Sequence, residues 1–100
     1  MRRVLIMTTA VQNTLDLDVR WVLHPQVALR PESFGALLYH FGTRKLSFLK
    51  NRTIVAIIES LPDHRDMRSA IAAAGIDESA SAPYVKAFAV LADSKMIVAA

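Results

Sequence analysis

The first half of the chain alternates between apolar and polar positions in a way that predicts strands. Pro25 and Pro31 lack backbone donors and enclose a short apolar stretch, so a strand is expected over residues 26–30. The run FGALLYHF, residues 34–41, is apolar on both faces and predicts a second strand. After a Gly-Thr turn, RKLSFLK alternates strictly, which predicts a third antiparallel strand over residues 44–50 and a hairpin with the second.

The third strand has two chemically different faces. Leu46 and Phe48 point to one side, whereas Lys45, Ser47 and Leu49 point to the other, and a register slip of one residue would exchange them. An alternating strand must bury one face, so Leu46 and Phe48 are expected in the core beneath the helices, with a binding role as the alternative. Leu49 is apolar among polar neighbours. It is therefore a candidate binding residue, and its replacement by Glu is expected to leave the fold intact.

The second half of the chain has helical periodicity. Asn51 is a good N-cap for a first helix, which Pro62 ends. Asp63 is expected to cap a second helix, which Gly75 terminates. Pro83 opens a third helix, and the final KMIV is expected to be a short extended tail. The predicted fold is α+β and winged helix-turn-helix-like, with a three-stranded antiparallel sheet followed by three helices.

Length and composition limit the size and the location of the protein. One hundred residues, 53% of them hydrophobic and 21% charged, suffice for one folded domain with one core. Residues 1–19 follow neither period and are expected to form an N-terminal arm, which places the domain at residues 20–100. The opening MRRVLIM has too few consecutive apolar residues for an export signal. No apolar run is long enough to span a bilayer, so a cytoplasmic protein is expected.

Charge is distributed unevenly along the chain. Residues 1–52 hold eight basic and three acidic residues, a net charge of +5. Residues 53–100 hold four basic and six acidic residues, a net charge of −2. An acidic partner is therefore expected to meet the first half of the chain.

The residues that usually carry catalysis or bind metals form no recognisable constellation. There is no cysteine, and the three histidines, His24, His40 and His64, lack the close spacing of a local metal site. His40 is expected to be a partly exposed residue on a strand face. No motif frames a nucleophilic serine, and three glycines make no phosphate-binding loop. We therefore expect no enzymatic activity, no metal and no cofactor.

Three interpretations of the pattern remain. In the first, a peptide adds as a strand beside RKLSFL, against the third helix; Lys45 and Lys50 fit that edge and fit an ordinary protected edge equally well. In the second, the domain is a winged-helix nucleic-acid-binding protein, although Asp63 and Asp66 on the second helix would repel phosphate. In the third, it is a structural module, with a homodimer as one way to cover the edge.

One long stretch resembles a known family. The series VALRPESFGALLYHFGTRKLSFLKNRTIVAIIESL, with WVLHP before it and AFAVLADSKMIV after it, is similar to PqqD-like precursor-peptide recognition domains, and within them to the small peptide chaperones of mycofactocin biosynthesis. The resemblance runs from Arg20 to Val98. It departs from the broader PqqD pattern at Lys50, which is an additional charge, and at PDHRDM, where a glycine turn is usual.

The resemblance implies a function and a site. It implies a protein that binds the leader of a precursor peptide as an added strand and delivers the peptide to a radical SAM maturase, without nucleic acid or membrane as partners. The peptide-binding residues that it implies are Arg44, Lys45, Leu46, Ser47, Phe48 and Leu49 on the strand, and Val85, Phe88, Ala89 and Ala92 on the third helix. A winged-helix nucleic-acid-binding protein is kept as the alternative.

Overall fold

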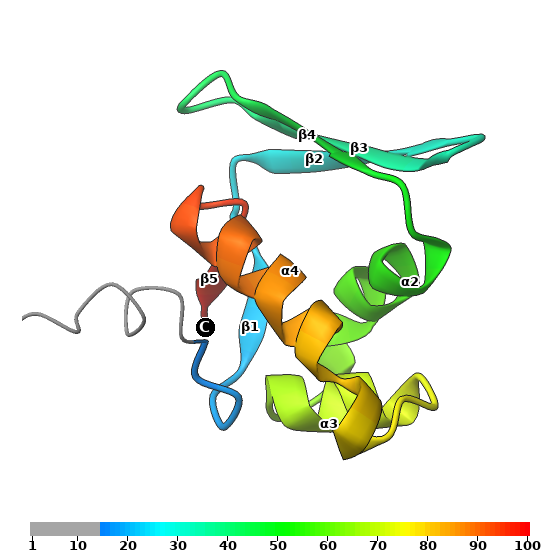
Figure 1. Ribbon diagram of the computed structural model, residues 1–100. Coiled ribbons are helices and arrows are strands. Elements are labelled where there is room, and N and C mark those ends of the chain that lie inside the picture. The colour runs from blue at the N-terminus through cyan, green and yellow to red at the C-terminus, as the bar shows by residue number, and fades with distance from the viewer. Residues whose placement is uncertain (1–14) are drawn as a thin grey trace, which may run out of the picture.

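The computed structural model describes residues 15–100. Its elements follow one another as β1 (Trp21–Leu23), β2 (Val27–Glu32), β3 (Gly35–His40), β4 (Leu46–Leu49), α2 (Arg52–Ser60), the 3-10 helix η1 (Leu61–Asp63), α3 (Met67–Ala73), the 3-10 helix η2 (Glu78–Ala80), α4 (Ala82–Asp93) and β5 (Ile97–Ala99). The expected α+β fold, with a three-stranded antiparallel sheet and three α-helices, is confirmed. The three α-helices lie on one side of that sheet (Figure 1).

The three-stranded sheet has the order β2-β3-β4, with both strand pairs antiparallel. The expectation that Pro31 ends the first of these strands is wrong, because β2 continues to Glu32. Phe41 N donates to Gln26 O, and alternation along the ladder then directs the backbone of Arg30 toward β3 and that of Pro31 toward the free edge. A proline is tolerated there because no ladder hydrogen bond needs its missing donor.

The chain termini of the domain form a second, two-stranded sheet. Strand β5 pairs antiparallel with β1, with Trp21 opposite Ala99 and Leu23 opposite Ile97. The extended tail expected at KMIV is thus a strand, and its partner lies about seventy-five residues earlier in the chain. Figure 1 shows this pair beside α4, away from the β2-β3-β4 sheet.

The helix ends follow local capping chemistry. Asn51 Oδ1 accepts a hydrogen bond from Ile54 N at 3.1 Å, so the expected cap of α2 is confirmed. The expectation that Asp63 caps the next helix is wrong: Asp63 belongs to η1, and the N-cap of α3 is Asp66, whose Oδ1 accepts from Ser69 N at 2.8 Å. Gly75 follows α3 with φ +84°, as expected for a helix stop.

The hydrophobic core lies between the sheet and the helices. Its largest fully buried side chains are those of Leu38, Ile57, Ile58, Leu61, Met67, Phe88, Met96 and Ile97. The inner face of the sheet is defined here by Ala36, Leu38 and Leu49, which join this core. Gly35, at φ +145°, lets β3 start against the end of β4, because a Cβ there would overlap the carbonyl oxygen of Leu49.

Within residues 15–100, no helix has the length and apolar character needed to cross a membrane. The predicted N-terminal arm is described only in part. Residues 15–19 lie against the start of α3, where Met67 N donates to Val19 O and Arg68 N to Leu17 O. Residues 1–14 fall outside the described part of the chain, so the boundary at residue 20 stays a prediction.

Candidate peptide-binding site

Strand β4 is a terminal strand of its sheet, and half of its backbone groups point outward. His40 N donates to Lys45 O at 3.0 Å, so the pairs of β3 and β4 that exchange hydrogen bonds alternate from that position. Ser47 and Leu49 consequently bond to β3. The N–H and C=O groups of Leu46 and Phe48 point away from it, and among the described residues no strand pairs with them. This edge can accept one further strand.

The side chains of β4 are arranged opposite to the expectation from the sequence. Leu46 and Phe48 are 52% and 60% exposed, whereas Leu49 is 8% exposed and Ser47 is half-buried. The expectation that Leu46 and Phe48 lie in the core is therefore wrong. The burial of Leu49 in the core also reverses the expectation for Leu49→Glu, which should now disrupt the fold. The physical reason is that the helices cover the face on which Ser47 and Leu49 lie.

The expected helical wall of the site lies mostly inside the molecule. Phe88 is fully buried and Ala89 is buried, whereas Val85 and Ala92 are half-buried. The closest helix neighbour of β3 and β4 is α2, not α4. Leu49 and Phe88 belong to one buried cluster, so both of these predicted site residues are core residues.

The other side of the sheet is apolar and open to solvent. We call this surface the outer face; it consists of Phe34, Leu37, Tyr39, Phe41, Leu46 and Phe48. Phe34 and Phe48 have ring centroids 6.1 Å apart, and Tyr39 and Phe41 meet edge to face at 5.0 Å. Sequence reasoning had singled out only Leu46 and Phe48 of this surface. The signal for the rest was that FGALLYHF carries apolar side chains on both of its faces.

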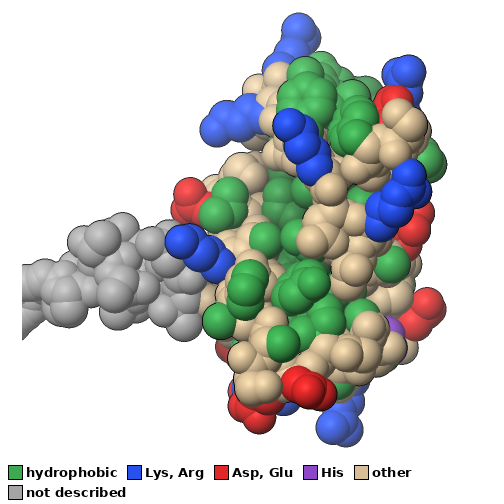
Figure 2. Space-filling model, turned by 45° about the vertical axis from the view of Figure 1, so that its right-hand side comes forward, with side chains coloured by type: hydrophobic (Ala, Val, Ile, Leu, Met, Phe, Trp, Pro, Cys, Tyr) green, Lys and Arg blue, Asp and Glu red, His purple; other side chains and the backbone are tan. Residues whose placement is uncertain are grey.

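Basic residues surround the outer face. Arg44 and Lys45 lie before β4, and Lys50 and Arg52 follow it; all four are exposed. In Figure 2 the cationic side chains at the top of the molecule stand around a patch of hydrophobic ones. Arg52 Nη2 also donates to Ser33 O at 2.6 Å, which ties the start of α2 to the turn before β3. The surface therefore combines apolar contact area with positive charge.

His40 supports the turn between β3 and β4. The side chain is 3% exposed, so the expectation of a partly exposed histidine is wrong. Its Nδ1 accepts hydrogen bonds from Gly42 N at 3.0 Å and from Thr43 N at 3.1 Å, which identifies Nε2 as the protonated nitrogen of the neutral ring. Nε2 has no hydrogen-bond partner, and the ring packs 4.4 Å from that of His24. His40 thus shapes the hairpin that precedes the open edge.

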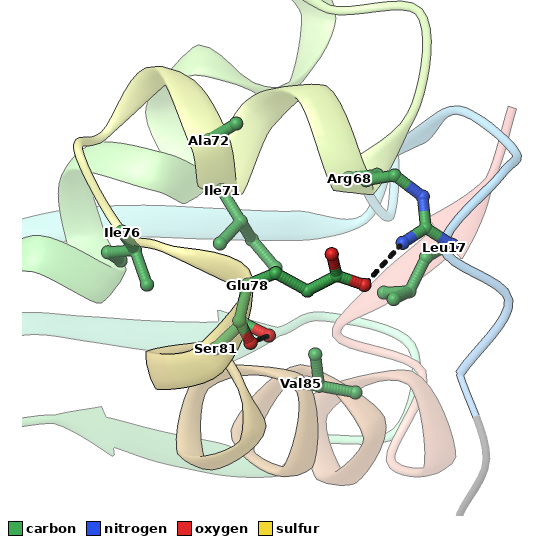
Figure 3. Close-up of a pocket in the computed structure, with 8 residues that line it drawn as sticks. All are labelled: Leu17, Arg68, Ile71, Ala72, Ile76, Glu78, Ser81 and Val85. Atoms are coloured by element: carbon green, nitrogen blue, oxygen red, sulfur yellow. Dashed lines mark hydrogen bonds and ion pairs between the residues drawn. The ribbon is translucent and has the colours of Figure 1, made fainter.

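Two cavities lie on the helical side of the molecule, away from β4. The first, of about 180 Å³, is lined by Leu17, Arg68, Ile71, Ala72, Ile76, Glu78, Ser81 and Val85, and Val85 points into it from α4 (Figure 3). The second, of about 260 Å³, lies between α2 and α3. Both are smaller than the ~300–1,000 Å³ usual for small-molecule sites, so neither supports a cofactor or substrate pocket.

Arg68 at the margin of the first cavity is held by acidic residues. Its Nε lies 3.1 Å from Asp18 Oδ1, and its Nη1 lies 3.8 Å from Glu78 Oε2. The hydrogen bond to Asp18, with the charge of Asp18, raises the pKa of Arg68. Because these carboxylates already neutralise the guanidinium, the cavity offers no free cation to a ligand. Within residues 15–100, no three histidine or acidic side chains gather as a metal site would require.

Comparison with known proteins gives a consistent result. The model of the Peptide chaperone MftB family matches residues 20–98. Similar curated relatives are the "Peptide chaperone MftB" of Mycolicibacterium smegmatis, 63% identical over 89% of this chain and 87% of the relative, and that of Mycobacterium ulcerans, 68% identical over 83% of this chain and 76% of the relative. The protein of the same name from Mycobacterium tuberculosis is 60% identical over 89% of this chain and 82% of the relative. The search of solved structures found no significant match. All three relatives carry the name of a chaperone, which is a non-catalytic role.

Proposed function

This chain belongs to the MftB peptide chaperone family, and we propose that it acts in mycofactocin biosynthesis by binding the leader of a short precursor peptide and presenting that peptide to a radical SAM maturase in the cytoplasm. The observation that carries the proposal is the open edge of β4. There the backbone groups of Leu46 and Phe48 point away from the sheet. Family membership favours this function over the winged-helix nucleic-acid alternative.

The leader lies beside β4 as a fourth strand of the sheet. Its backbone pairs with Leu46 and Phe48, which supplies affinity without sequence preference. Leader side chains directly opposite these two residues share the outer face, so apolar residues at alternate leader positions pack on Leu46 and Phe48. Acidic leader residues fit Lys45 and Lys50 at the two ends of the strand. The leader is therefore apolar at alternate positions and acidic at its flanks.

The buried residues of the predicted site have a different role in this arrangement. Leu49 and Phe88 lie in the buried core, so they do not touch the leader in this arrangement. Ser47 and Ala92 are half-buried, and Arg44 is exposed at the turn before β4. We assign leader contact to Arg44, Lys45, Leu46 and Phe48, with Ser47 bonded to β3.

Strand addition is tested by removing one outward backbone donor. Leu46→Pro eliminates the outward N–H of Leu46 and no bond to β3, and an edge strand tolerates proline at such a position. Leu46→Ala removes the side chain and keeps the donor. If the leader pairs with β4, Leu46→Pro should bind it roughly 2- to 12-fold more weakly than Leu46→Ala, the loss of one hydrogen bond.

The measurement is calorimetric titration with the precursor peptide encoded beside the gene, full-length and without its leader. Wild-type protein should bind the first and not the second. Equal affinity of Leu46→Pro and Leu46→Ala would show that the leader does not pair with this strand. Binding of neither peptide by folded wild-type protein would overturn the proposed function as a whole.

A further inference from the structure

The outer face is too wide for a leader strand to cover. Neighbouring strands are ~4.8 Å apart, so a strand added at β4 packs on Leu46 and Phe48 and leaves the residues of β3 and β2 beyond its reach. Tyr39 on β3 and Phe41, which directly follows β3, stay open, and Phe41 is 60% exposed. A second surface is therefore available while the peptide is bound.

Charge restricts what can cover this surface. Residues 26–52, which form the sheet and its turns, hold five basic residues and one acidic residue, a net charge of +4. The single acid, Glu32, already pairs with Arg30 at 3.0 Å. A second copy of the chain placed face to face would bring two such positive surfaces together, so the charge disfavours a homodimer here.

The aromatic rings of the face favour protein over nucleic acid as the partner. Stacking platforms for single strands present free ring faces to the bases. Here Tyr39 packs edge to face on Phe41, and Phe34 is tilted by 49° against Phe48. Leu37 and Leu46 between them are aliphatic. Such a mixed, interlocked surface resembles the apolar centre of a protein–protein interface with a polar margin.

We propose that the outer face docks the peptide-modifying enzyme itself, through an apolar patch on that enzyme that carries acidic residues at its margin. The inference rests on the proposed function, because it takes the β4 edge as occupied by the leader. The leader strand continues the same sheet, so its outward side chains and the outer face form one continuous surface. The enzyme thereby recognises chaperone and peptide together.

The experiment separates enzyme docking from leader binding. Phe41→Ser changes the outer face one strand away from the edge, and Val90→Ser is the matched control, since Val90 is 59% exposed on α4. The purified radical SAM maturase encoded with the same precursor peptide is immobilised, and the Kd of each chaperone variant is measured with the full-length precursor bound. Leader affinity is measured in parallel by calorimetry.

Phe41→Ser should weaken binding to the maturase roughly tenfold or more and leave the leader Kd within about twofold. Val90→Ser should change neither. Phe34→Ser repeats the test at the other end of the face, so that the result does not depend on the folding of one variant. Arg30→Glu on β2 should slow association with the maturase and weaken its salt dependence.

Two kinds of outcome overturn the inference. One is unchanged maturase binding by folded Phe41→Ser and Phe34→Ser proteins that still bind the leader. The other is a different occupant of the outer face, with maturase binding unchanged in the Phe41→Ser protein. This occupant would be a second copy, if Phe41→Ser dissociates a wild-type dimer, or a nucleic acid, if Phe41→Ser abolishes tight binding of a single-stranded oligothymidylate. Failure of wild-type protein to bind the leader would instead refute the proposed function, which the calorimetric arm reports separately.

Discussion

Both faces of the β2-β3-β4 sheet carry apolar side chains, but their environments are opposite. The inner face buries Ala36, Leu38 and Leu49 against the helices, while the outer face leaves Leu46 and Phe48 more than half exposed. Apolar area contributes to stability only where it is removed from water, at roughly 25 cal/mol per Å². The inner face therefore accounts for folding, and the outer face is free to contribute to binding.

The difference teaches that an apolar strand position does not identify a core position. In a one-sided sheet the helices decide which face is covered, and neighbouring residues such as Phe48 and Leu49 take opposite roles. Contiguous exposed apolar residues on a soluble domain usually mark an interaction surface. The following predictions test this division of roles, from the largest expected effect to the smallest.

The sharpest test places one carboxylate on either face of β4. Leu49→Glu would bury an ionised group in the core, at a cost of several kcal/mol against a total stability of about 5–15 kcal/mol. We expect Leu49→Glu to lose its cooperative thermal transition, monitored by far-ultraviolet circular dichroism. Phe48→Glu, one residue away, should fold as wild type and lose leader affinity. A Leu49→Glu protein that melts like wild type would abolish the distinction between the faces.

Truncation of leucine measures the same distinction on a finer scale. Leu38→Ala should lower the free energy of unfolding by about 3 kcal/mol, because it removes fully buried methyl groups and leaves a cavity. Leu46→Ala should change it by less than about 0.5 kcal/mol, because Leu46 is exposed. Urea denaturation of both variants gives the comparison. Similar losses in the two would mean that the outer face is covered in the folded protein.

His40 is the one buried polar side chain among residues 15–100, and it connects the inner face to the hairpin turn. His40→Ala should cost about 2 kcal/mol of unfolding free energy, because the N–H groups of Gly42 and Thr43 lose their acceptor. The control Thr43→Ala keeps both bonds and should have a smaller effect. A His40→Ala protein with the urea midpoint of wild type would show that water replaces the ring.

Acid should weaken the N-terminal cap of α3. Hydrogen bonds from the Ser69 side chain and backbone lower the pKa of Asp66 below the ordinary value of an aspartate. The stabilisation by Asp66 is therefore present above the unfolded pKa and is lost as pH falls through the lowered folded pKa. Asp66→Asn, which keeps a capping side chain, should reduce the fall in melting temperature between neutral pH and about pH 3. If the melting temperature of the Asp66→Asn protein falls with pH as much as that of wild type, a group other than Asp66 causes the loss of stability in acid.

Local chemistry allowed several elements to be predicted from the sequence. The hairpin of β3 and β4, the Asn51 cap of α2 and the glycine stop after α3 each depend on residues a few positions apart. The two wrong boundaries had equally physical causes. Pro31 fits inside β2 because that strand is an edge, and Asp63 lies in η1 because the chain takes one tight 3-10 turn before Asp66 caps α3.

The candidate site was predicted as a segment and not as a surface. Residues 44–49 were singled out from the sequence, and the edge they form is present, whereas leader contact remains a proposal. The burial of Phe88 and Leu49 and the exposure of Phe48 depend on which side the helices pack. Alternation along a strand is symmetric with respect to its two faces, so it cannot carry that information.

The sequence by itself determined the class of the fold, the positive charge of the first half and the membership in a family whose match covers residues 20–98. These properties depend on composition, local periodicity and residue identity. Only the tertiary structure decided that β5 pairs with β1, that β4 is a free edge and that the aromatic side of the sheet faces water. Each of these features depends on contacts between segments far apart in the chain. The free energy of packing decides which of those contacts form, and a local sequence pattern does not contain it.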